Sequence, residues 1–154
     1  MNLNNFTIQA QGILQQAQQL AFNESNPNIE TAHLLKALLE DKEGPVPYLL
    51  KKNNVNTGFV DDKLKQQIAR LPKIQGGGEP AQSISREANN VILKAGAVLK
   101  EFGDEFVTPE HLLIAIVQLN DETGKLLKDA GLTEKGLIAA IKELRKGSTV
   151  TSQT

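Results

Sequence analysis

The sequence predicts an all-α fold of eight helices, arranged as two pseudo-symmetric four-helix repeats. Apolar residues recur at spacings of three and four along most of the chain, which is typical of helices with one buried face. The 154 residues include five phenylalanines, one tyrosine and no tryptophan. The core must therefore consist of Leu, Ile, Val and Ala, a mixture that favours helices over a β-sandwich. The third observation is an internal repeat.

The repeat is clearest at AHLLKAL (32–38), which returns as EHLLIAI (110–116) with His33 matching His111 at a shift of 78 residues. At the same shift, the apolar stripe of residues 10–20 falls on that of residues 88–98. Neither copy can bury its apolar faces well alone, so we expect the two copies to pack together about a pseudo-two-fold axis. The groove between them is the expected functional surface.

The first copy, residues 1–71, is predicted to contain four helices. Thr7 is a suitable N-cap for the first helix because its hydroxyl can accept a hydrogen bond from the first turn. Pro27 marks a loop after that helix, Gly44 and Pro45 separate the second helix from the third, and Pro72 ends the fourth. The four helices are expected at 7–22, 31–41, 46–53 and 57–71.

A Gly/Pro-rich linker is expected at residues 72–83, because three consecutive glycines lie between Pro72 and Pro80. The second copy, residues 84–146, then repeats the same order. Its signals are Ser85, Thr108 and Thr133 as N-caps, Pro109 at a first helical position, and Gly103 and Gly131 after helix ends. Its helices are expected at 86–102, 108–119, 122–130 and 134–146, followed by a polar, flexible tail at 147–154.

Composition excludes several classes of function. The net charge is −1 and no basic stripe occurs, so the electrostatic footprint of a nucleic-acid-binding protein is missing. The absence of cysteine excludes disulfides, thiolate zinc sites and a cysteine nucleophile. The start of the chain lacks the pattern of a signal peptide, and no apolar run approaches the ~20 residues of a membrane span. We therefore expect a cytoplasmic protein without membrane or nucleic-acid partners.

The two histidines occupy equivalent positions and could suggest a metal site. Each lies in the first turn of a predicted helix beside two leucines, and Ala37 and Ala115 stand where a second ligand at i+4 would be. Zinc requires three or four ligands. Because duplication copies packing roles, we interpret His33 and His111 as structural, and we expect no metal or cofactor in this chain.

Other catalytic and binding patterns are weaker still. Gly76–Gly78 is followed by Glu79-Pro80 rather than the Lys-Ser/Thr of a phosphate loop, and no Gly-x-Ser-x-Gly sequence occurs. The carboxylate pairs Asp61-Asp62 and Asp104-Glu105 lie in polar stretches and are interpreted as solvated or capping groups. The helix at 108–119 is too apolar for a DNA recognition helix.

Taken together, the repeat resembles the Clp N-terminal repeat domain, which stands at the front of the Clp-class AAA+ unfoldases and disaggregases. The resemblance covers roughly residues 1–146 and is most like the ClpB-type disaggregase branch. The segments that carry it are AHLLKALLED (32–41), LLKKNNVN (49–56), RLPKIQGGG (70–78), GDEFVTPEHLLIAI (103–116) and LLKDAGLT (126–133).

The resemblance implies a function. Domains of this family engage unfolded or aggregated polypeptide and help to deliver it to a homohexameric ATPase ring that uses ATP and Mg²⁺. The chain contains no Walker A sequence, so we expect a non-catalytic, monomeric domain whose tail leads to the ATPase part. The alternative is an adaptor-docking domain of the ClpA/ClpC type, found in protease-associated unfoldases.

The family's substrate surface includes a threonine, an aspartate and a glutamate that correspond to Thr7, Asp104 and Glu110. Ile92 corresponds to an apolar position of the family's groove, whereas Lys94 and His111 stand where one family pattern has leucines. Each polar residue also has a structural interpretation: Thr7 as an N-cap, Asp104 as a turn residue, and Glu110 as a partner of the helix dipole. The resemblance therefore predicts a substrate site at Thr7, Ile92, Asp104 and Glu110.

Overall fold

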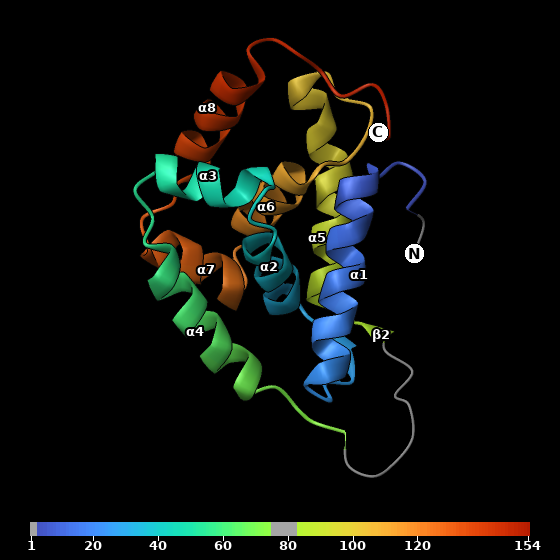
Figure 1. Cartoon of the computed structure of the whole chain (residues 1–154), viewed down its shortest axis with the longest axis vertical. Helices are drawn as coiled ribbons and strands as arrows, with labels where there is room; N and C mark the ends of the chain where they lie inside the picture. Colours follow the sequence, from blue (N-terminus) through green and yellow to red (C-terminus); the bar gives the residue numbers. More distant parts are fainter. Residues whose placement is uncertain (1–2, 75–82) are drawn as a thin grey trace.

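The fold was analysed in a computed structural model that describes residues 3–74 and 83–154. Within these residues the chain forms eight α-helices, as the sequence predicts (Figure 1). Most of the predicted linker, at 75–82, lies outside the described residues. The first copy contributes α1 (Ile8–Asn23), α2 (Thr31–Glu40), α3 (Pro45–Lys52) and α4 (Thr57–Ala69), and the second copy contributes α5 (Arg86–Ala97), α6 (Pro109–Leu119), α7 (Glu122–Asp129) and α8 (Glu134–Arg145).

One predicted helix, at 86–102, is divided in the structure. Its last turn is a separate 3₁₀ helix, η1 (Val98–Phe102), which ends at Gly103 in the left-handed conformation with φ 66°. Tightening into 3₁₀ geometry is common at the end of an α-helix. The predicted caps are present at Thr7, Ser85 and Thr133, whose hydroxyls accept backbone N–H groups of the first turn.

The core is built around α2 and α6, which lie in the middle of the molecule (Figure 1). Every residue of α6 from Pro109 to Val117 is buried, and so are eight of the ten residues of α2. A helix that is covered on all sides must be apolar all round, which explains why the repeated segments AHLLKAL and EHLLIAI are the most apolar of the chain. Within each copy, the central helix packs against the first and fourth helices.

Two short backbone pairings cross between the copies. β1 (Asn28–Ile29) pairs in parallel with β2 (Ser83–Ile84), and Phe6 forms an isolated parallel bridge with Val107. At the shift of 78 residues these are equivalent: the Ser85 N–H donates to Ile29 O at 3.0 Å, and the Thr7 N–H donates to Val107 O at 3.0 Å. Each copy therefore supplies the segment before its first helix to the loop before the other copy's central helix. We call the two pairings the Ile29–Ile84 seam and the Phe6–Val107 seam.

Residues 147–154, which the sequence predicts to be a flexible tail, return to the start of α1 in the structure. The Ile8 N–H donates to Gln153 O at 2.8 Å, and the Glu105 N–H donates to Val150 O at 2.7 Å. The side chain of Gln153 donates to Asn4 O at 2.8 Å. The tail therefore lies against the Phe6–Val107 seam.

Close packing between α6 and α7 makes a testable prediction at Gly124. A Cβ atom on this buried residue would overlap the main-chain oxygen of Ile116, and backbone cannot move aside as a flexible side chain can. Gly124→Ala should therefore lower the free energy of unfolding by about 2 kcal/mol. Gly12→Ala, at an exposed helical glycine with nothing within 4 Å of the added atom, should instead raise it by up to about 1 kcal/mol. Urea denaturation checks both, and equal effects of the two variants would contradict the packing described here.

Candidate functional site

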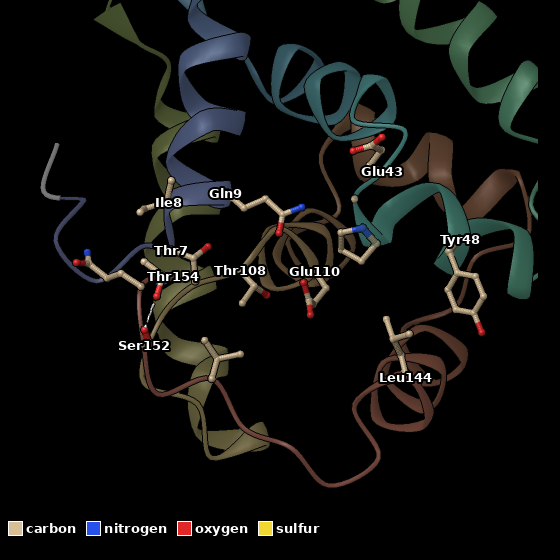
Figure 2. A pocket seen from close by; sticks show the side chains of 14 residues that line it. Thr7, Ile8, Gln9, Glu43, Tyr48, Thr108, Glu110, Leu144, Ser152 and Thr154 are labelled. Atoms are coloured by element: carbon tan, nitrogen blue, oxygen red, sulfur yellow. Dashed lines mark hydrogen bonds between the residues drawn. The ribbon is translucent and has the colours of Figure 1, made fainter.

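A hollow of about 790 Å³ lies at the Phe6–Val107 seam. It opens between the starts of α1, α3 and α6, the end of α8 and the tail (Figure 2). Thr7, Thr108 and Glu110 lie together in the middle of the view, with Tyr48 and Leu144 to one side and Ser152 and Thr154 to the other. The full lining is Thr7, Ile8, Gln9, Glu43, Gly44, Pro45, Tyr48, Thr108, Glu110, Leu144, Val150, Ser152, Gln153 and Thr154.

The hollow combines exposed apolar side chains with buried polar ones. Ile8 is 60% exposed, Tyr48 48% and Leu144 43%. Thr7 and Glu110 are both less than a tenth exposed. Large apolar side chains at the surface that surround a concave region are typical of a site for another chain. Thr7 and Glu110 are hydrogen-bonded to other residues of the domain, so their positions are fixed and they contribute little contact area.

Buried charges organise the floor of the hollow. Arg145, at the end of α8, donates from Nη1 to both carboxylate oxygens of Asp104 at 2.9 and 2.8 Å. Its Nε and Nη2 donate to Glu110 Oε2, each at 3.2 Å. One guanidinium thus binds two buried carboxylates at once, for which the planar donor set of arginine is better suited than the single ammonium of lysine. Edge contact between the rings of Phe102 and His111, with centroids 5.6 Å apart, closes the network on the side of η1.

His111 links this network to the start of α6. Its Nδ1 accepts the Thr108 N–H at 2.8 Å, so this nitrogen carries no proton and Nε2 must carry the one of the neutral ring. The Nε2–H then donates to Asp104 Oδ2 at 2.8 Å. Histidine therefore replaces the usual Glu or Gln of a capping box, since it accepts the backbone N–H of the residue before the helix.

The first copy contains the same arrangement in uncharged form. His33 Nδ1 accepts the Glu30 N–H at 2.9 Å, and its Nε2–H donates to Asn26 Oδ1 at 2.8 Å. Asn26 is the counterpart of Asp104 at the shift of 78, and Ala32 is the counterpart of Glu110. The two copies therefore differ at both positions, Asn26 against Asp104 and Ala32 against Glu110.

The choice of Asn26 or Asp104 follows from what each binds. The Asn26 amide donates to Pro72 O at 3.0 Å, whereas Asp104 Oδ1 accepts the Val150 N–H at 2.8 Å. Proline has no N–H and offers only a carbonyl, so the residue facing it must donate. Val150 offers an N–H, so a carboxylate can face it, and its charge then requires Arg145.

The structure brings together three of the four predicted site residues. Thr7 and Glu110 line the same hollow, and Asp104 lies beneath them, joined to Glu110 through Arg145. Ile92 lies on α5, is 7% exposed, belongs to the hydrophobic core and does not line the hollow. Sequence reasoning missed Ile8, Tyr48, Leu144 and Arg145, because nothing local distinguishes them from ordinary surface residues.

Burial changes the pKa of both histidines. It lowers the pKa of His33 to about 4. Burial also lowers the pKa of His111, and the nearby carboxylates of Glu110 and Asp104 offset only part of the effect. Both rings are therefore neutral at pH 7, consistent with their hydrogen bonds.

Neither a metal centre nor a membrane span is found in residues 3–74 and 83–154. No group of three or more His, Cys, Asp or Glu side chains is placed to hold a metal ion there. No helix in these ranges is long and apolar enough to cross a bilayer.

Fold and site define a helical domain made of two interlocked copies of one unit, with a hollow at one seam. Residues 5–130 match the model of the Clp repeat (R) N-terminal domain, and the chain belongs to this family. It is 44% identical, over 154 residues, to the chaperone protein ClpB of Bacteroides thetaiotaomicron, and 41% identical to ClpB of Porphyromonas gingivalis. In both cases the whole chain is covered but only 18% of the relative's length. Because these relatives are ClpB chaperones, the ClpA/ClpC type is not favoured.

Solved structures show the same fold. The Hsp104 N-terminal domain from Candida albicans superposes with a TM-score of 0.82 at 22% identity, and each chain is 98% covered. The N-terminal domain of the Clp-protease-associated chaperone ClpD from Arabidopsis thaliana has a TM-score of 0.70 at 19% identity, with 96% of this chain and 98% of that chain covered.

Arg145 should be essential for stability. Arg145→Met would leave Asp104 and Glu110 buried without a counter-charge, so the free energy of unfolding should fall by about 3 kcal/mol. The matched control is Arg70→Met, which removes the pair with Glu122 that is 62% and 69% exposed and should change stability by less than about 1 kcal/mol. Denaturant melts of the two variants provide the measurement. An Arg145→Met protein as stable as Arg70→Met would disprove the role of the network.

The lowered pKa of His33 predicts a dependence of stability on pH. Between the ordinary value of 6.5 and the folded value of about 4, the unfolded chain binds a proton that the folded chain does not. Stability from this residue is thus complete above pH 6.5 and is lost as pH falls, by up to about 1.4 kcal/mol per unit. His33→Gln keeps an acceptor at the capping position but does not titrate. Its stability should fall less steeply over this range than that of the unmodified protein, whereas parallel curves would show that the folded pKa of His33 is not depressed.

Proposed function

We propose that this domain binds unfolded or aggregated polypeptide in the hollow at the Phe6–Val107 seam, and that it does so as the substrate-recognition part of a ClpB-type disaggregase. Family membership and the 44% identity to a ClpB chaperone support the role in a ClpB-type disaggregase. The exposed apolar rim formed by Ile8, Tyr48 and Leu144 supports binding of unfolded polypeptide in the hollow. A folded client hides its apolar side chains, whereas an unfolded one can place them here.

Binding of this kind should be weak. Burying apolar surface yields about 25 cal/mol per Å², and much of this is lost in ordering a flexible chain. Weak sites become effective when several are tethered to one assembly, because the second contact is then intramolecular. We therefore propose that the domain acts as one of six in a hexameric parent, in which ATP and Mg²⁺ drive the ATPase ring that receives the client.

The proposed roles of the predicted site residues follow from their positions. Thr7 and Glu110 lie at the wall of the hollow, where a client's polar groups can reach them at the edge of the rim. Asp104 acts through Arg145 and fixes Glu110 in place. We propose that Ile92 supports a second apolar surface on α5, where its neighbour Leu93 is 66% exposed.

Ile8 provides the direct test of the hollow. Ile8→Ser should weaken binding of a fluorescently labelled, reduced and carboxymethylated unfolded protein about tenfold, the equivalent of ~1.4 kcal/mol of lost apolar contact, without changing stability. Phe22→Ser is the control, because Phe22 is 43% exposed at the other end of the same helix. Fluorescence anisotropy measures the affinity. Equal losses in both variants would mean that clients bind apolar surface indiscriminately, and loss in Leu93→Ser alone would move the site to α5.

A further inference from the structure

The tail meets the hollow through its main chain. Both peptide groups of Val150 are used: its N–H donates to Asp104 Oδ1 at 2.8 Å, and its carbonyl accepts the Glu105 N–H at 2.7 Å. Three residues further on, Gln153 O accepts the Ile8 N–H at 2.8 Å. These hydrogen bonds involve only main-chain groups of the tail, so they do not depend on its sequence. Extended peptides are commonly recognised through main-chain hydrogen bonds of this kind.

Two groups of the domain that bind the tail, the Ile8 N–H and Asp104 Oδ1, are free to bond to a segment outside the helices. The Ile8 N–H belongs to the first turn of α1, where no intrahelical partner exists, while Thr7 Oγ1 satisfies only the Ala10 N–H. Asp104 Oδ1 is buried and accepts from Arg145 as well as from Val150. A chain segment that runs past both groups therefore satisfies polar atoms that would otherwise need water.

The position of the tail coincides with that proposed for the client. Val150, Ser152, Gln153 and Thr154 line the hollow together with Thr7, Ile8 and Glu110. Figure 2 shows Ser152 and Thr154 beside the start of α1, close to Ile8 and Thr7. Val150 is half-buried there, whereas Thr151 and Ser152 are exposed. The segment is thus held by a few bonds and not by a packed core, as a displaceable contact requires.

We propose that residues 150–153 occupy the client site in cis as a strap, and that an unfolded chain binds by displacing the strap and taking over its main-chain bonds to Ile8, Asp104 and Glu105. The inference rests on the proposed function, whose client it specifies: a non-helical segment with a free backbone and at least one β-branched or apolar side chain in the place of Val150. Asp104 is then a positioning residue for whichever chain occupies the hollow.

The strap can be weakened without touching the folded core. Val150→Pro removes the N–H that Asp104 accepts, and Gln153→Ala removes the side-chain bonds to Asn4 O and Phe6 O. Because three hydrogen bonds that hold the strap are lost, the Val150→Pro/Gln153→Ala double variant of the full chain should bind the carboxymethylated unfolded protein at least tenfold more tightly. Thr151→Ala, at an exposed side chain of the same segment, is the control and should leave the affinity unchanged.

A second measurement follows the strap itself. In ¹⁵N-labelled protein the double variant should shift the amide resonances of Ile8 and Glu105. A synthetic peptide of residues 147–154, GSTVTSQT, added to the double variant should return those resonances towards their original positions and compete with the unfolded protein.

The outcomes separate this inference from the proposed function. Tighter client binding by the double variant, with reversal by the peptide, supports the strap. Unchanged or weaker client binding at the hollow overturns the strap and leaves the proposed function intact. Failure of both the unmodified chain and the double variant to bind the unfolded protein at Ile8 overturns the proposed function and the strap with it.

Discussion

The structure depends on the two crossed backbone pairings that join the copies. In each, the residues just before one copy's first helix bond to the loop just before the other copy's central helix. These bonds fix where α1 and α5 start, and so position the apolar stripes that cover α2 and α6 (Figure 1). Each pairing takes one segment from each copy, so both pairings form only when the two copies are packed together.

The two seams share a backbone geometry but differ in charge. At one, His33 and Asn26 form an uncharged pair, and Asn26 donates to Pro72 O. At the other, His111, Asp104, Glu110 and Arg145 form a buried charged network that binds the Val150 N–H. The carboxylates of this network accept hydrogen bonds from Arg145, His111 and the Val150 main chain, while the apolar rim above them remains exposed. The two copies share one scaffold, and the candidate site lies where their symmetry breaks.

Much of the fold could be predicted from the sequence, because its signals are local. The 3–4 spacing of apolar residues, the N-caps Thr7, Ser85 and Thr133, and the repeat centred on His33 and His111 predict the helices to within a few residues. The crossed seams could not be predicted, because two-residue pairings such as Asn28–Ile29 with Ser83–Ile84 leave no pattern in a sequence. The 3₁₀ turn at Val98–Phe102 was missed because its apolar spacing continues that of α5.

The candidate site was predictable only in part. Thr7, Asp104 and Glu110 were identified through resemblance to a family, and the structure brings them together. Arg145 lies 35 residues from Glu110 and 41 from Asp104 along the chain, a separation at which no sequence spacing predicts contact. The contacts of the tail could not be predicted, because its bonds to Ile8 and Glu105 come from backbone groups, which composition does not report.

The two seams are alike in backbone, and the proposed function assigns client binding to only one of them. Titration of ¹⁵N-labelled protein with an unfolded client compares them within one molecule, because Thr7, Ile8 and Val107 report on one seam and Ser85, Arg86 and Ile29 report on the other. We expect the amide shifts to gather at the Phe6–Val107 seam and to leave the Ile29–Ile84 seam unchanged. Shifts of equal size at both seams, or shifts spread evenly over the surface, would contradict it.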